Sequence, residues 1–197
     1  MNSRLYLEGG GDSKEGRIRC REGFRKLLEQ SGFLGKLPRL TACGGRANVF
    51  DDFKTSLASR NNGFVAMLID SEDPLEDLER AWDHLKRRDG WVNPSGATDE
   101  QVFFMTTCME TWIVADRIAL RDYFRPTLHE SALPSLVDLE KRERGDILKQ
   151  LTHATRDCSN AYSKGRCSFE VLGKLNPSAL NVLPSFARMV RILKEKL

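Results

Sequence analysis

The sequence predicts an α/β protein: a parallel sheet of about four strands with helices on both faces. Three observations support this. Apolar runs of strand length alternate with segments of helical periodicity through the first 125 residues, a pattern typical of parallel sheets. The run Phe64–Ile69 is apolar at every position, as expected of a strand covered on both faces. The chain has 197 residues, 40% hydrophobic and 30% charged, which suits a globular protein with a buried core.

The strands and helices of this pattern follow one another in strict alternation. The expected strands are short apolar runs, and they cover Arg4–Leu7, Pro38–Cys43, Phe64–Ile69 and Gln101–Thr106. The expected helices carry apolar residues at intervals of three and four, and they cover 20–28, 49–57, 73–85 and 108–121. The third helix is expected to start at Asp73-Pro74, because Asp is a good N-cap and Pro fits the first helical turn.

The chain is expected to divide near residue 125. Residues 1–125 form the α/β core, and residues 126–197 form a mainly helical C-terminal extension that packs on it. Pro126 and Pro134 punctuate the start of the extension, where the alternation of strands and helices stops. Apolar residues between Leu180 and Leu193 predict a terminal amphipathic helix.

Composition excludes several classes of protein. A net charge of +3 and a pI of about 8.6 permit nucleic-acid contact without demanding it. No apolar run approaches the roughly 18 residues that span a bilayer, and we expect a cytoplasmic protein. The five cysteines form no C-x-x-C pair, which argues against a zinc knuckle or a disulfide framework. Gly9-Gly10-Gly11 lacks the G-K-[ST] ending of an ATP-binding P-loop.

Acidic residues follow two of the expected strands. Glu8 ends the first strand, and Asp70, Glu72 and Asp73 follow the third. Because ligands bind at the carboxyl ends of parallel strands, these carboxylates are expected to converge there. Converging carboxylates repel one another unless a cation neutralises them, and oxygen ligands favour Mg²⁺ or Mn²⁺. The sequence therefore predicts a divalent-metal site, although Asp73 has the alternative role of a helix cap.

Two further residues are expected at the same edge. Glu110 lies just past the fourth strand and is a candidate outer metal ligand; its alternative role is to complement the dipole of a helix N-terminus. Arg46 follows Gly44-Gly45 at the end of the second strand. It would either bind a phosphate bidentately or pair with an acid of the cluster.

Basic residues suited to phosphate contact occur in two places. Lys14, Arg17, Arg19 and Arg21 follow the triple glycine, where the backbone turns tightly and a helix start offers amide donors to a phosphate. Lys164 and Arg166 flank Gly165 in the extension and would fold back onto a nucleic-acid backbone; the alternative is a solvated basic loop.

At these residues the chain resembles the TOPRIM fold of topoisomerases, bacterial primases, overcoming-lysogenization-defect nucleases and small ribonucleases. Glu8-Gly9 matches the glutamate and glycine that follow the first strand of that family. Asp70-Ser71-Glu72 matches its D-x-D motif, with glutamate in place of the second aspartate. The resemblance implies that Glu8 is a general acid/base or a metal ligand, and that Asp70 and Glu72 hold Mg²⁺.

Over nearly its whole length the chain is also similar to a bacterial family of unassigned function with a TOPRIM-like core. The matching stretches are Glu8–Asp12, Cys43–Arg46, Ile69–Pro74, Met109–Asp116 and Ser163–Arg166. Members are often companions of ABC-type or AAA-type ATPases in anti-phage operons. The resemblance implies a Mg²⁺- or Mn²⁺-dependent nuclease that cleaves DNA or RNA with such an ATPase; the alternative is a non-catalytic, regulatory partner subunit of the ATPase.

Overall fold

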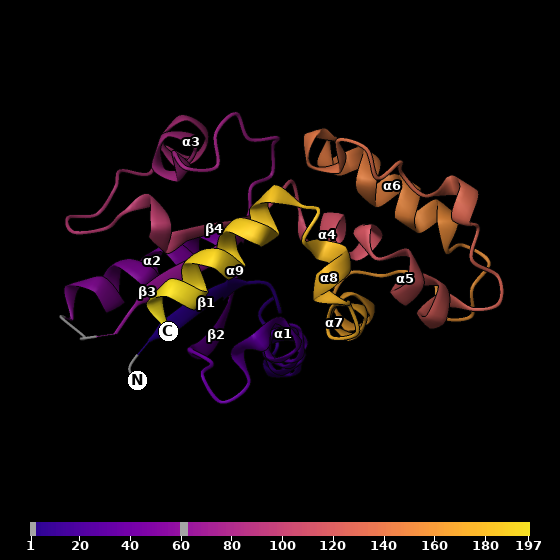
Figure 1. Ribbon diagram of the computed structural model, residues 1–197, viewed down its shortest axis with the longest axis horizontal. Coiled ribbons are helices and arrows are strands. Elements are labelled where there is room, and N and C mark those ends of the chain that lie inside the picture. The colour runs from indigo at the N-terminus through magenta and orange to yellow at the C-terminus, as the bar shows by residue number, and fades with distance from the viewer. Residues whose placement is uncertain (1–2, 60–62) are drawn as a thin grey trace.

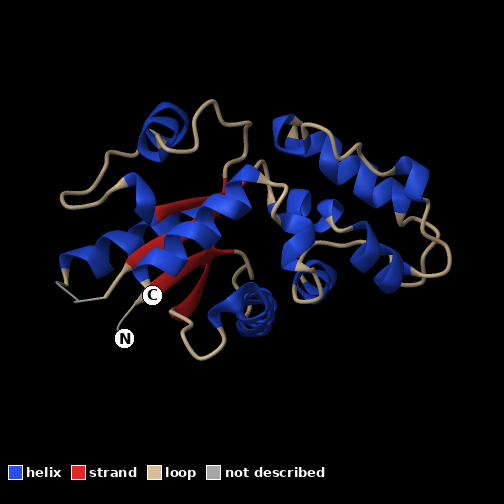
Figure 2. Ribbon diagram, viewed as in Figure 1, coloured by secondary structure: helices blue, strands red, loops and turns tan. Residues whose placement is uncertain are grey.

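The fold is a four-stranded, all-parallel sheet between layers of helices (Figures 1 and 2). It was obtained as a computed structural model, which describes residues 3–59 and 63–197. The strands are β1 (Arg4–Glu8), β2 (Arg39–Gly44), β3 (Val65–Asp70) and β4 (Val102–Met105), and they lie in the order β2-β1-β3-β4. The α/β class and the parallel sheet predicted from the sequence are confirmed.

Helices cover both faces because strand residues alternate between two apolar clusters. Leu5 and Leu7 of β1 face a core shared with α1 and α9, and Tyr6 faces a second core shared with α2 and α3. The helices are α1 (Lys14–Leu28), α2 (Arg46–Ala58), α3 (Ala81–Asp89), α4 (Met109–Ala115), α5 (Arg117–Phe124), α6 (Arg144–Ala154), α7 (Arg166–Leu172), α8 (Pro177–Leu180) and α9 (Pro184–Lys196). A π-helical turn, Glu29–Phe33, continues α1.

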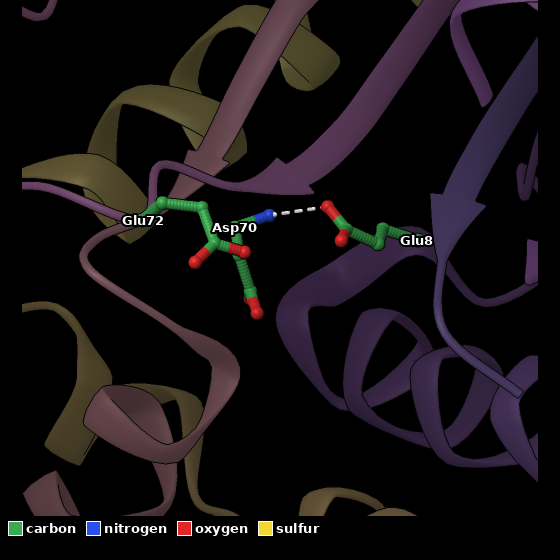
Figure 3. Close-up of side chains that lie close together, drawn as sticks. All are labelled: Glu8, Asp70 and Glu72. Atoms are coloured by element: carbon green, nitrogen blue, oxygen red, sulfur yellow. Dashed lines mark hydrogen bonds between the residues drawn. The ribbon is translucent and has the colours of Figure 1, made fainter. Parts of the chain in front are cut away.

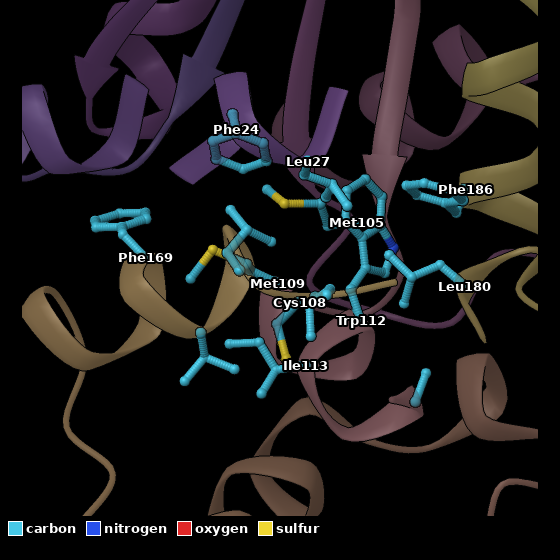
Figure 4. Packing of buried hydrophobic residues seen from close by; sticks show 14 of the residues in the cluster. Phe24, Leu27, Met105, Cys108, Met109, Trp112, Ile113, Phe169, Leu180 and Phe186 are labelled. Carbon is cyan, nitrogen blue, oxygen red and sulfur yellow. The ribbon is translucent and has the colours of Figure 1, made fainter. Parts of the chain in front are cut away.

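The residues after 125 share the larger core with the sheet. In Figure 4, Phe169 of α7, Leu180 of α8 and Phe186 of α9 lie among the side chains of α1, β4 and α4. Trp112 of α4 is fully buried at the centre of this contact, with its ring 5.1 Å from that of Phe186. The C-terminal helices therefore complete the covering of one face of the sheet. None of the described helices has the length and apolar character needed to cross a membrane.

The helix predicted to start at Asp73 is wrong in its first turns, since α3 begins only at Ala81. Glu72 adopts a left-handed backbone conformation, φ 69°, and its amide donates to the Thr107 carbonyl at 2.8 Å. The Asp73 carboxylate accepts from Arg88 at 3.1 Å instead of from helix amides. The chain after β3 is therefore held by α3 and by the loop after β4, and Asp73 is not a helix cap.

The single helix predicted over 108–121 is also wrong, because the chain breaks at Asp116 into α4 and α5. The Asp116 side chain is buried and accepts backbone hydrogen bonds from Ile118, Ala119 and Asn176, the last at 2.7 Å. It therefore caps α5 and at the same time holds the segment that leads into α8. Apolar periodicity runs through the break, which is why the sequence pattern did not reveal it.

Replacement of Asp116 by alanine leaves three backbone amides, one buried and two partly buried, without their acceptor. We expect the free energy of unfolding to fall by about 2–3 kcal/mol, and to fall less in Asp116→Asn, which keeps one acceptor oxygen. Urea unfolding followed by circular dichroism measures both. Asp122→Ala, an exposed acid on α5, is the matched control; an equal loss in Asp122→Ala would remove the capping role.

Candidate metal centre

The candidate site lies where the strand order reverses. The chain passes from β1 to β2 on one side and then crosses to β3 on the other side of β1. In open parallel sheets the loops diverge at such a point and leave a crevice beyond the carboxyl ends of the strands. Glu8 is the last residue of β1 and Asp70 is the last residue of β3. The topology therefore brings both acids to this crevice.

Three acids meet there, as Figure 3 shows. One carboxylate oxygen each of Glu8, Asp70 and Glu72 lies within 4.8 Å of the others. Glu8 accepts a hydrogen bond from the Asp70 amide at 3.0 Å, and Asp70 accepts one from the Met109 amide, at the start of α4, at 2.8 Å. These contacts leave oxygens of all three acids for a cation. We call Glu8, Asp70 and Glu72 the acidic triad.

The triad carries strong electrostatic repulsion. Burial, together with the charges of Glu8 and Glu110, raises the pKa of Asp70 to about 8. Burial also raises the pKa of Glu8, although Arg46 and the Asp70 amide oppose the shift. Without a cation, the site therefore holds a proton near neutral pH that a bound divalent ion would displace.

Arg144, which the sequence analysis did not single out, supplies a compensating charge. Its guanidinium forms an ion pair with Glu72 and lies 3.8 Å from the Asp70 carboxylate. It stands at the first position of α6, in the extension. No motif in the sequence marks it, because its partners lie in the α/β core and only tertiary packing brings them together.

Arg46 takes the second of the roles left open by the sequence. Its guanidinium binds both carboxylate oxygens of Asp89, at 3.0 and 2.8 Å, and donates to the Asp70 carbonyl. It also lies 3.7 Å from Glu8. Its N–H donors therefore bind groups of the protein itself. Arg46 links β3 to α3 and the triad, and its guanidinium is not free to bind a phosphate bidentately.

Glu110 borders the triad without joining it. A cavity of about 450 Å³ is lined by Glu110 together with Glu8, Asp70 and Arg144. The Glu110 side chain is only 1% exposed, and its Oε1 accepts from the Tyr162 hydroxyl at 2.5 Å. Its Oε2 has no hydrogen-bond partner among the described residues. Tyr162 was also missed from the sequence, since an isolated tyrosine in a helical region gives no signal.

The glycines after β1 bring α1 close to the cavity. A Cβ on Gly16 would lie 2.2 Å from the Gly10 carbonyl oxygen, so the loop and the helix can pack only without side chains there. Arg17 donates to the Gly11 carbonyl at 3.2 Å and so holds this loop. Arg19 lines the cavity, whereas Lys14 is exposed and is not among the lining residues.

The three remaining residues predicted from the sequence differ in their position relative to the triad. Lys164 lines the cavity, with its ammonium 3.8 Å from Glu110. Asp73 is 60% exposed, binds Arg88 and does not belong to the triad. Arg166 begins α7, and its side chain lies outside the described residues. Lys164 therefore lies beside the triad, as the sequence analysis expected, whereas Asp73 lies outside it.

Sheet, crevice and triad together define an α/β protein with an acidic site at its topological switch point. The chain belongs to the family described as Domain of unknown function (DUF4276), which it matches over residues 7–194. The match spans both the α/β core and the helical extension. Comparison with curated proteins and with solved structures found no match in either case.

The raised pKa of Asp70 gives the metal-free protein a characteristic pH dependence. Between its ordinary value of 3.8 and about 8, folded Asp70 holds a proton that the unfolded chain has released. Stability from this group is therefore lost as the pH rises through that window.

Asp70→Asn removes this titration and keeps an acceptor for the Met109 amide. At pH 8 we expect its free energy of unfolding to exceed that of the wild type by about 1–3 kcal/mol, and the difference to shrink toward pH 4. Urea unfolding in the presence of a chelator, between pH 4 and 9, measures this. A difference that stays constant with pH would contradict it; Asp51→Asn, an exposed acid on α2, should show a constant difference.

Proposed function

We propose that the protein is a Mg²⁺- or Mn²⁺-dependent nuclease with a TOPRIM-like core. The observation that carries this proposal is the convergence of the acidic triad within 4.8 Å at the switch point of the sheet. Carboxylates brought this close, one of them buried with a raised pKa, fit a hard divalent cation. Among the described residues no histidine or cysteine joins them, which disfavours zinc.

The protein's own groups would divide the work of phosphodiester hydrolysis. Glu8, Asp70 and Glu72 would hold the cation, with Glu110 beside it as an outer ligand or an orienting group. A bound divalent cation stabilises the charge that develops on the attacking and leaving oxygens. Lys164 and Arg19 line the same cavity and would bind the phosphate on either side of the scissile bond. Cytoplasmic location and action beside an ABC-type or AAA-type ATPase in phage defence are part of this proposal.

The direct test is incubation with plasmid DNA, single-stranded DNA and total tRNA, with Mg²⁺, Mn²⁺ or a chelator. We expect cleavage of at least one substrate that depends on the metal and falls by at least about 100-fold in Glu8→Gln and Asp70→Asn. Gel electrophoresis of end-labelled substrates measures the rate.

The control is Glu195→Gln, which neutralises an exposed acid on α9 and should cleave at the wild-type rate. Circular dichroism checks that each variant is folded. Cleavage that survives in both Glu8→Gln and Asp70→Asn would assign the activity to a contaminant or another site and would overturn the proposal.

Arg144 favours a second candidate function. A cation that is already part of the chain neutralises Glu72 and approaches Asp70, so the triad is compensated without a metal. A protein built this way would be a non-catalytic subunit, and the natural role is to regulate an ATPase partner.

Metal binding separates the two candidates. For the nuclease we expect isothermal titration with Mn²⁺ to show saturable binding by the wild type that Asp70→Asn weakens at least tenfold, because a first ligand is lost. For the regulatory subunit we expect no binding by the wild type and newly acquired binding in Arg144→Ala, where the competing charge is removed. Arg156→Ala, an exposed arginine just after α6, is the control for loss of one positive charge and should match the wild type.

A further inference from the structure

A second hollow lies away from the triad, between the strands β1 and β2 and the helix α2. Its volume is about 570 Å³, within the range of about 300–1,000 Å³ that is typical of small-molecule sites. Arg4 is the first residue of β1 and Glu8 is the last, so at about 3.3 Å per residue these two residues are about 13 Å apart. The hollow therefore lies toward the amino-terminal ends of the strands, beside the edge strand β2, whereas the triad lies at their carboxyl ends.

Strand register places two arginines side by side in this hollow. Arg4 is paired with Arg39 across β1 and β2, and Tyr6 is paired with Thr41 two residues further on. Because alternate strand residues share a face, all four side chains lie on the side of the sheet that α2 covers, and all four line the hollow. The pairing of the strands thus places both arginines at one end of the hollow.

The two arginines carry positive charge that nearby acids do not cancel. Within the described part of the chain, no acid lies within ion-pairing distance of Arg4 or Arg39. Asp52 is the single acid among the described lining residues, and it is within hydrogen-bonding reach of the Cys43 thiol. The hollow therefore keeps a net positive charge, which favours an anionic ligand.

The opposite wall offers hydroxyl groups from α2. Ser56 is only 4% exposed, lines the hollow, and its Oγ has no hydrogen-bond partner among the described residues. A buried hydroxyl without a partner is destabilising, and serine in a helix usually relieves this by bonding the carbonyl four residues earlier. Thr55 and Thr41 add hydroxyls to the same lining. An unpartnered buried donor in the wall of a hollow that two arginines also line is what a bound oxyanion would satisfy.

We propose that this hollow binds a phosphate group, with Arg4 and Arg39 contacting its oxygens and the Ser56 hydroxyl donating to it. Arginine forks match the geometry of phosphate oxygens, and hydroxyl donors complete such sites. The phosphate would come either from a free phosphate compound such as a mononucleotide or from a nucleic-acid backbone. The site does not depend on the triad or on the proposed nuclease activity.

Isothermal titration with pyrophosphate, AMP and a short oligonucleotide, with EDTA present to silence the triad, tests this site. We expect saturable binding of at least one probe, weakened about tenfold in Arg39→Ala and in Arg4→Ala, since each loses a charge-assisted contact. Arg125→Ala, an exposed arginine just after α5, should bind like the wild type. Binding of AMP or pyrophosphate identifies a free phosphate compound as the source, and binding of the oligonucleotide alone identifies a backbone.

Ser56→Ala supplies a readout that a structural role would not give. Because the hydroxyl has no partner among the described residues, its loss should leave the melting temperature unchanged or raised, while affinity for the bound probe falls several-fold. Absence of binding by every probe up to millimolar concentration would overturn the proposal. So would an equal loss of affinity in Arg125→Ala and Arg39→Ala, which would indicate only a general attraction to a basic protein.

Discussion

The repulsion among carboxylates at the ends of β1 and β3 is the constraint around which the site is built. Asp70 is buried beside Glu8 and close enough to Glu110 for both charges to raise its pKa. Without compensating groups, a carboxyl in this environment would move to solvent or remain protonated. Here the Met109 amide, the guanidinium of Arg144 and the ammonium of Lys164 each offset part of the charge. A divalent cation would offset the remainder.

This constraint explains why the helical extension is inseparable from the α/β core. Arg144, Tyr162 and Lys164 all come from residues after 125, yet each contacts an acid of the α/β core, either Glu72 or Glu110. The same segment contributes Phe169 and Phe186 to the main hydrophobic core. The same C-terminal segment therefore packs into both the site and the hydrophobic core. This agrees with a family match that runs from residue 7 to 194.

Local signals in the sequence were enough for the sheet to be predicted and for all three triad residues to be expected at one edge of it. The wholly apolar run Phe64–Ile69 predicts a buried strand. Parallel strands bring Glu8 and Asp70 to one edge of the sheet independently of the loop conformations. Asp73 was misplaced because an Asp-Pro pair resembles a helix start, whereas the contacts of Arg88 and Thr107 decide the local path. Arg144 gave no local signal, since its importance arises only from packing across the fold.

Glu72 is the point at which the two candidate functions diverge physically. Its left-handed backbone, φ 69°, aims a side chain one methylene longer than aspartate back into the triad. In the proposed nuclease, that extra reach would let the same carboxylate bind either Arg144, as it does here, or a cation in place of the Arg144 guanidinium. A metal that displaced Arg144 from Glu72 would leave the Arg144 guanidinium available to bind a phosphate. One exchange of partners would therefore both bind the metal and supply a cation for the substrate.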